Sequence, residues 1–228
     1  MSTDVVWPVS VQWAQLTLRP LSMRDRAEWD SVRYRNREWL EPWEASNPLP
    51  GGDPPTYRQF VRLMRAQAKQ GTCLPWLITE LNPDTCRHEL VGQLSVSSII
   101  GGSFRSASLG YWVDAAQAGR GIAPMAVAMA TDYCFQHLNL HRMEINIRPE
   151  NVKSLRVVEK LGFRDEGLRK DFLHISGHWR DHRSFALTSP EVPRGLVHRF
   201  TGSDEPMSVR TGRTRRARQG YPEESTAS

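Results

Sequence analysis

One stretch of the chain constrains its fold more than any other, because a strand pattern runs directly into a glycine-rich turn and then into a helix. In SASLGYWVD every second residue is apolar, and GRGIAPMAVAMATDYCFQHLN follows with a helical pattern. HRMEINIRP then alternates apolar and polar residues again, as a second strand does. A strand, a helix and a strand in this order predict an α/β unit.

The segments on either side of this unit continue the alternation of strands and helices. Ser22 and Asp25 have the spacing of an N-terminal cap for a helix that runs to about Leu40, and Gly71 and Gly162 end two later helices. We therefore expect an α/β (α+β) fold with one core, in which about four helices flank a mixed sheet of about six to seven strands. The remaining expected elements are a strand in VQWAQLTLRPL, a helix in PTYRQFVRLMRAQAKQG, an antiparallel hairpin of LPWLITEL and HELVGQLSVSSII around the turn NPDT, a short helix in NVKSLRVVEKLG, and two strands that turn at Ser176 and Gly177.

Composition predicts a globular, cytoplasmic protein. Hydrophobic residues make up 39% of the 228 residues and charged residues 24%, which allows a sizeable core and excludes global disorder. No apolar run approaches the roughly 18 residues needed to span a bilayer, and MSTDVVWPVS has neither a basic leader nor an apolar signal region. Cys73, Cys86 and Cys134 form no C-x-x-C pair, which suits a reducing compartment.

The positive charge is concentrated toward the C-terminus. The formal net charge is +5, and the residues from Pro193 onward contain seven arginines against four acids. VRTGRTRRARQGYPEESTAS has almost no large apolar residues, so burial cannot offset the entropy of ordering it. We expect a domain at residues 1–192 and a flexible, arginine-rich tail at residues 193–228. Two roles stay open for this tail: weak contact with RNA or the ribosome, or a solvated extension without a partner.

The glycine-rich turn has the character of an anion site. A strand that ends at a helix N-terminus presents unpaired main-chain N–H groups and the positive end of the helix dipole, which suits a diphosphate. Gly119 and Gly121 let a ligand approach the backbone, and Pro124 falls where a missing N–H costs least. The turn matches neither the P-loop nor the dinucleotide-binding pattern. By itself it is equally compatible with a structural turn.

A second helix start follows about 30 residues later, in RPENVKSLRVVEKLGFRDEG. Both helix starts fall at the same edge of the expected sheet, where one ligand can bridge them. At this point the chain resembles the GNAT family of N-acetyltransferases, and within it the RimJ/RimL branch that acetylates the N-termini of ribosomal proteins. The resemblance runs from about Leu16 to Leu187. It rests on the blocks GYWV, GRGIAP, LHRMEINIRPEN, NVKSLRVVEKLGF and GHWRDH.

The resemblance implies a GNAT fold with acetyl-CoA as donor and CoA as product. In the family the diphosphate lies on the main-chain amides of the turn, and the pantetheine arm pairs with the strand edge before it. The family pattern is matched at Gly121 and Ala123 but not at Ala118, a departure that main-chain binding tolerates. The residues so assigned to the cofactor are Trp112, Val113, Gly119, Arg120, Gly121, Ile122, Ala123, Asn151 and Ser154.

Asn151 and Ser154 match the N-x-x-S pattern of the family. The resemblance places Asn151 beside the pantetheine and Ser154 near the sulfur, where its hydroxyl protonates the departing thiolate. The alternative is that both residues only cap the helix, as Asn and Ser commonly do. Ser154 is the one residue to which we assign a catalytic role.

The sequence offers no clear general base to take a proton from the attacking amine. Relatives often have a carboxylate in the strand before GYW, where this chain has Ala107, Ser108 and Leu109. Other acids are available, but each is better explained as a solvated surface charge. An α-amine with a pKa near 8 is about one-tenth neutral at pH 7, whereas a lysine near 10.4 needs about 4.6 kcal/mol to lose its proton. This difference favours an N-terminal α-amine as acceptor. The other acids that could face an acceptor are Glu41, Glu44, Glu80 and Asp114.

Two further patterns in the sequence have structural explanations as well as functional ones. His174, His178 and His182 recur every four residues, but Gly177 interrupts any helical face, so we expect no metal site. Trp39 and Trp43 flank a proline-rich loop and either line an acceptor cleft or anchor the loop.

The sequence thus predicts a cytoplasmic N-acetyltransferase that transfers acetyl to a protein N-terminus, expected to be that of a ribosomal protein, by direct attack in a ternary complex. A second enzymatic interpretation keeps the fold but uses a small-molecule amine or a larger acyl-CoA. A third, of another class, is a ribosome- or RNA-associated binding protein with a regulatory CoA site. Both a monomer and a homodimer remain open.

Overall fold

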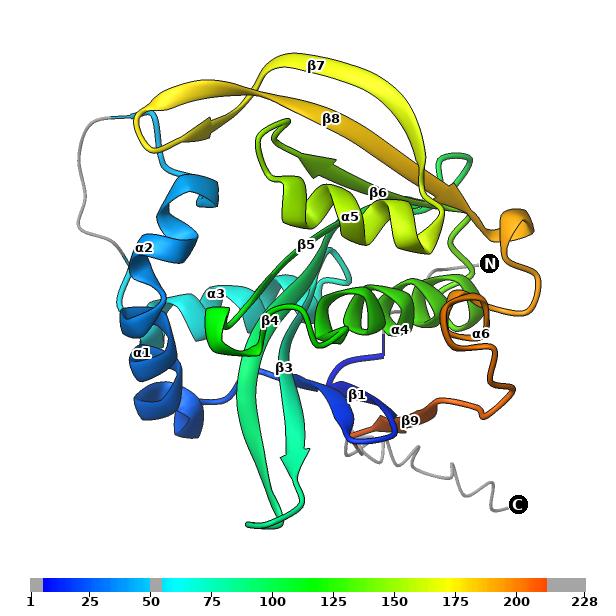
Figure 1. Cartoon of the computed structure of the whole chain (residues 1–228), viewed down its shortest axis with the longest axis horizontal. Coiled ribbons are helices and arrows are strands. Elements are labelled where there is room, and N and C mark those ends of the chain that lie inside the picture. Colours follow the sequence, from blue (N-terminus) through cyan, green and yellow to red (C-terminus); the bar gives the residue numbers. More distant parts are fainter. Residues whose placement is uncertain (1–5, 50–54, 213–228) are drawn as a thin grey trace, which may run out of the picture.

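The computed structural model describes residues 6–49 and 55–212 and is built on one mixed sheet (Figure 1). The strands lie in the order β7-β8-β6-β5-β4-β3-β2-β1-β9, and β5 and β6 form the parallel pair. The strands are β1 (Val9–Trp13), β2 (Leu16–Pro20), β3 (Leu74–Asn82), β4 (Arg87–Ile100), β5 (Ser106–Val113), β6 (Arg142–Ile147), β7 (Arg164–Ile175), β8 (His178–Thr188) and β9 (Ser208–Thr211). The helices are α1 (Arg26–Arg35), α2 (Arg37–Leu40), α3 (Tyr57–Lys69), α4 (Ile122–Gln136), α5 (Val152–Leu161) and α6 (Leu196–Thr201).

Two hydrophobic clusters cover the two faces of the sheet. The larger one joins α4, α5 and α6 to one face, and α4 is buried along most of its length, which explains its nearly continuous apolar sequence. The smaller cluster joins α1 and α3 to the other face through Val32, Val61 and Leu77. The predicted α/β fold with a mixed sheet between helices is confirmed. The sheet has nine strands, which is more than predicted.

Several local predictions are confirmed by the element boundaries. The Ser22–Asp25 capping box is formed, and Gly162 ends α5 in the left-handed conformation. The hairpin of β3 and β4 and the hairpin of β7 and β8 turn where predicted.

Two predictions about the N-terminal region are wrong. VQWAQLTLRPL is not one strand but the hairpin of β1 and β2, which turns at Ala14 with a φ of 48°. The two-residue turn shifts the alternation by one position: Val9 and Val11 are buried before it and Leu16 and Leu18 after it. The apolar Ala14 lies at the shift and masks it in the sequence. The predicted helix to Leu40 is divided at Asn36, which lies between α1 and α2 with a φ of −101° and ψ of 7°.

The chain after residue 192 differs from the predicted tail. Leu196 and Val197 of α6 are buried against α4, and their N–H groups donate hydrogen bonds of 2.5 and 2.8 Å to the buried carboxylate of Asp132. Strand β9 pairs with β1 at the edge of the sheet. The short apolar run of α6 therefore belongs to the core. The rest of the predicted tail, residues 213–228, lies outside the described residues. In the described part of the chain, no helix is long and apolar enough to cross a membrane.

Candidate functional site

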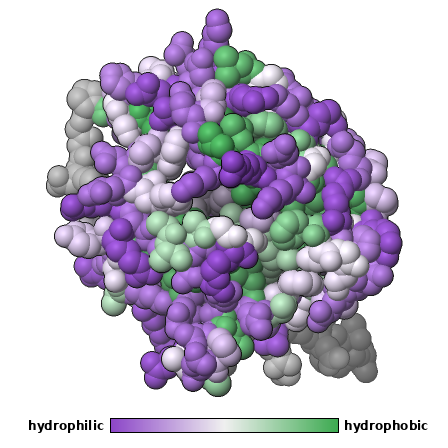
Figure 2. All heavy atoms as spheres, viewed as in Figure 1, coloured by the Kyte–Doolittle hydropathy of each residue, from purple (hydrophilic) through white to green (hydrophobic). Residues whose placement is uncertain are grey.

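Strands β5 and β6 start side by side and then separate. Their parallel pairing covers only Ser106–Ser108 against Arg142–Glu144. Beyond this, residues 109–113 of β5 pair only with β4, and residues 145–147 of β6 pair only with β8. We call this opening the β5–β6 fork. A space-filling view from the same side shows a recess near the centre of the molecule, in the region of the fork in Figure 1 (Figure 2).

The free edge of β5 presents main-chain groups to the fork. The N–H of Asp114 donates to the Val91 carbonyl on β4, at 2.9 Å, and successive residues of a strand point their main-chain groups in opposite directions. The main-chain N–H and C=O of Val113 therefore point away from β4. The Val113 carbonyl accepts a 3.2 Å hydrogen bond from the indole of Trp39. The side chain of Trp112 packs with the α1–α3 cluster.

The end of β5 is fixed by a buried carboxylate. Asp114 is 2% exposed and caps the short 3₁₀ turn at Ala115–Gln117 by accepting a hydrogen bond from the Ala116 N–H, at 3.1 Å. The side chain of Asn36 donates to Asp114 at 2.9 Å and accepts from the Ala115 N–H at 2.8 Å, and Arg35 pairs with the same carboxylate. Arg35 and Asn36, at the break between α1 and α2, thus hold the start of the loop in place.

The loop that follows has free main-chain donors. Gly119 and Gly121 adopt left-handed φ values of 85° and 86°. The Gly121 carbonyl accepts the first hydrogen bond of α4, from Met125 at 3.1 Å. Among the described residues, no protein acceptor is bound to the N–H groups of residues 119–123. Five adjacent donors at the start of a 15-residue helix form a site for an anionic group.

The side chain of Arg120 binds the sheet. Its guanidinium forms a bidentate ion pair with Glu80 on β3, with hydrogen bonds of 2.8 and 3.0 Å, and it also contacts Gln117. The pair ties the loop to the sheet. Glu80, one of the acids considered as a base, is therefore engaged, and what Arg120 offers at the loop is its main-chain N–H.

The second helix start lies across the fork from the free edge of β5. Asn151 caps α5, and its side-chain oxygen accepts a 3.1 Å hydrogen bond from the Ser154 N–H. This confirms the capping interaction and leaves the Ser154 hydroxyl outside it. Ser154 is half-buried, and its hydroxyl lies beside the phenol of Tyr111 on β5. Lys153 sits over the ring of Trp39, with Nζ 3.8 Å from the ring centroid.

Comparison with known proteins identifies the family of this chain. A model of the acetyltransferase (GNAT) domain matches residues 15–164 of the chain, which is more than half of it. The chain belongs to the GNAT family. It is accordingly an N-acetyltransferase, and acetyl-CoA is the donor that this family uses.

Several GNAT relatives are similar over most of the chain. The [ribosomal protein uS5]-alanine N-acetyltransferase of Escherichia coli is 32% identical over 76% of this chain and 88% of its own length. The structure of Mycobacterium smegmatis RimJ in complex with CoA-disulfide superposes with a TM-score of 0.78 at 37% identity, covering 86% of this chain and 95% of that one. A probable N-acetyltransferase of Bacillus subtilis, YjcK, is 41% identical, but the match spans only 56% of that protein and 45% of this chain.

In this GNAT protein the segment after α2 is docked onto the β7–β8 hairpin. The Ser46 N–H donates to the His174 carbonyl, and the Ser176 hydroxyl donates to the Glu41 carbonyl, both at 2.9 Å. Arg148, at the end of β6, donates to the Pro42 carbonyl at 2.6 Å and lies over the ring of Trp43. Trp43 therefore anchors the loop, and Trp39 borders the fork.

The acids that the sequence offered as bases are mostly engaged elsewhere. Glu44 forms an ion pair with Arg33, and Glu80 and Asp114 hold the loop. Hydrogen bonds from Arg35 and Asn36 hold the pKa of Asp114 below its usual value, although its burial acts in the opposite direction. Glu41 is exposed at the surface.

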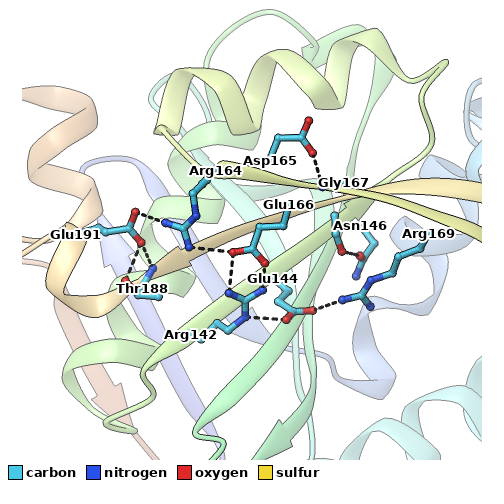
Figure 3. Close-up of polar contacts among 11 residues, drawn as sticks. Arg142, Glu144, Asn146, Arg164, Asp165, Glu166, Gly167, Arg169, Thr188 and Glu191 are labelled. Carbon is cyan, nitrogen blue, oxygen red and sulfur yellow. Dashed lines mark hydrogen bonds and ion pairs between the residues drawn. The ribbon is translucent and has the colours of Figure 1, made fainter.

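Sequence reasoning missed two features of the fork. One is the Tyr111–Ser154 contact, because it depends on how β5 faces α5. The other is an ion-pair network on β6, β7 and β8 (Figure 3), in which Arg142 bridges Glu144 and Glu166. The Arg142 guanidinium, opposed in part by desolvation, lowers the pKa of Glu166 to about 2. Glu144 lies opposite Ser108, where the fork opens, and is held by Arg169 as well as Arg142. The network joins β6 to the β7–β8 hairpin.

Proposed function

We propose that this protein acetylates the α-amine at the N-terminus of a protein, expected to be a ribosomal protein, by direct transfer from acetyl-CoA. The observation that carries the proposal is the set of five free main-chain donors at residues 119–123, at the mouth of the fork. Two relatives that match most of the chain, one named as a uS5-alanine N-acetyltransferase and one as RimJ, support this acceptor class. A ribosomal acceptor also supports a cytoplasmic location for the reaction.

The residues present fit the donor. Gly119, Arg120, Gly121, Ile122 and Ala123 would offer main-chain N–H groups to the diphosphate, which is a good match for a doubly charged group at a helix start. The free edge of β5 at Val113, whose main-chain groups point away from β4, would run alongside the pantetheine arm, as a strand lies beside an extended chain. Trp112 would contribute from the adjoining position of the strand, because its own main-chain groups point toward β4.

The second set of residues would act at the thioester. The main-chain N–H of Val113 would meet the oxyanion of the tetrahedral intermediate. Asn151 would lie beside the pantetheine, and Ser154 would donate its hydroxyl proton to the departing sulfur. The supporting observation is that the Asn151 cap binds the main-chain N–H of Ser154 and not its hydroxyl.

The engagement of most of the candidate bases among the described residues supports an α-amine as acceptor. An α-amine is about one-tenth neutral at pH 7, so its deprotonation by water costs only about 1.4 kcal/mol, against about 4.6 kcal/mol for a lysine. The carboxylates Glu44, Glu80 and Asp114 are engaged in ion pairs. In the described part of the chain, the engagement of these three carboxylates suits an amine that loses its proton easily.

Mass spectrometry of candidate acceptors tests this proposal. The full chain is incubated with acetyl-CoA and peptides that carry the N-terminal sequences of ribosomal proteins, each with one internal lysine. We expect one acetyl group, placed on the α-amine. The matched control is the same peptide with a blocked N-terminus, which should stay unmodified.

Other products in this assay would contradict the proposal and select an alternative. Acetylation of spermidine or another small amine, with unmodified peptides, would make this a small-molecule acetyltransferase. Transfer only from a longer acyl-CoA would change the donor. CoA binding without transfer to any acceptor would favour the binding-protein interpretation.

A further inference from the structure

One buried hydroxyl in the fork is not explained by the fold. Tyr111 packs among the core residues on the α4–α5 side of β5, and its phenolic oxygen is shielded from solvent. Among the described residues, no group makes a hydrogen bond of ordinary geometry with this oxygen. Buried polar groups without a partner are destabilising and rare in native structures. A phenylalanine at this position would fill the same space without that cost.

The hydroxyl of Ser154 lies beside the phenol, although the two do not form a hydrogen bond of ordinary geometry in this structure. Tyr111 lies on the β5 arm of the fork and Ser154 on α5, which follows the β6 arm, so their contact spans the two arms. Burial raises the pKa of Tyr111 to about 12, and the Ser154 hydroxyl lowers it only in part. The phenol therefore keeps its proton at neutral pH and is available as a donor.

We propose that Tyr111 is a positioning residue, which donates a hydrogen bond to the oxygen of Ser154 once acetyl-CoA is bound and so directs the Ser154 proton toward the sulfur of acetyl-CoA. A serine hydroxyl has one proton, and in the first turn of a helix it readily turns back to the main chain. A donor on one lone pair of Ser154 leaves that proton free for another acceptor.

The inference rests on the proposed function, because it assumes that the thioester lies toward Ser154. In that reaction the amine nitrogen bonds to the acetyl carbon, the carbon–sulfur bond breaks, and the electron pair stays on sulfur. The amine releases its proton to water. Ser154 donates a hydrogen bond to the developing thiolate, passes that proton to the sulfur and recovers a proton from water, while Tyr111 holds Ser154 in place and stays protonated.

The Tyr111→Phe variant separates this role from a structural one. Because the lost hydroxyl has no ordinary partner, we expect an unchanged or higher melting temperature. We expect kcat to fall about tenfold, with the KM for acetyl-CoA within about twofold of wild type, since the contact matters when the sulfur leaves. The matched control is Thr131→Val, which removes another buried, unpartnered hydroxyl in the second half of α4 and should leave kcat unchanged.

A double-mutant cycle shows whether Tyr111 acts through Ser154. In the Ser154→Ala background, Tyr111→Phe should have no further effect on kcat. A kcat unchanged in the single variant would overturn the proposal. So would an additive fall in the double variant, or a clear loss of melting temperature in Tyr111→Phe, which would show a structural partner for the phenol.

Titration of bound CoA supplies a measurement that needs no acceptor. The ultraviolet absorbance of the thiolate reports the pKa of the CoA thiol on the enzyme. We expect this pKa to rise in both Tyr111→Phe and Ser154→Ala, because each removes support for the thiolate. An unchanged thiol pKa in Tyr111→Phe would contradict the role of Tyr111. Failure of peptide acetylation by the wild type would instead count against the proposed function alone.

Discussion

Gly121→Val is expected to weaken acetyl-CoA binding about 100-fold while the protein still folds. Gly121 has a φ of 86° at the start of α4, a conformation that β-branched residues avoid, and an added Cβ would stand in open space beside the loop amides. The backbone would have to change at the donors assigned to the diphosphate. Hydrogen bonds to a charged group contribute about 1.5–3 kcal/mol each, so the loss of one or two accounts for the expected effect.

Gly102→Val is the matched control for this variant. Gly102 also has a left-handed φ, of 65°, with no atom near its missing Cβ, but it lies in the turn between β4 and β5, outside the fork. Both variants should lose about 1–2 kcal/mol of stability through backbone strain. Calorimetric titration with acetyl-CoA should show wild-type affinity for Gly102→Val only. Equal affinities for the two variants would remove the loop from the binding site.

Asp114→Ala is expected to lower the free energy of unfolding by about 3 kcal/mol, because it leaves buried partners unpaired. The side chain of Asn36, the Ala116 N–H and the guanidinium of Arg35 all bind this carboxylate. Acetyl-CoA affinity should fall as well, since the start of the loop is held by these contacts. Urea unfolding gives the stability change. Asp30→Ala, which breaks an exposed ion pair with Arg26, is the control and should change stability by less than about 1 kcal/mol.

The effect of Asp114 should depend on pH in a defined direction. Its pKa in the folded protein lies below the ordinary value of 3.8, so its contribution to stability is complete above pH 3.8 and is lost as the pH falls through the lowered value. The stability difference between wild type and Asp114→Ala should therefore be largest near neutral pH and shrink in acid. A difference that stays constant down to strongly acidic pH would show that the charge of Asp114 contributes nothing.

Elements set by local pattern could be predicted from the sequence, and those set by distant contacts could not. The core strands and α3, α4 and α5 follow from apolar periodicity and from caps such as Asn151. The break at Asn36 could not, because its side chain is fixed by Asp114, 78 residues away. Helix α6 was also missed, since the partner that fixes its N-terminus is Asp132, buried on α4.

The features of the candidate site also divide into those that the sequence predicts and those that depend on distant contacts. The glycine loop and the N-x-x-S helix start are contiguous in sequence, so their positions could be predicted. The engagement of Arg120 by Glu80 joins residues 40 apart, and the contact of Tyr111 with Ser154 depends on the angle at which β5 and β6 separate. Which side chains meet across the fork therefore needed the structure.

Amide chemical shifts during a titration with CoA test the central claim most directly. In ¹⁵N-labelled protein, saturating CoA should produce its largest amide shifts at residues 119–123, and CoA lacking the diphosphate should leave these signals in place. If CoA binds but these five signals do not shift, the start of α4 does not hold the donor.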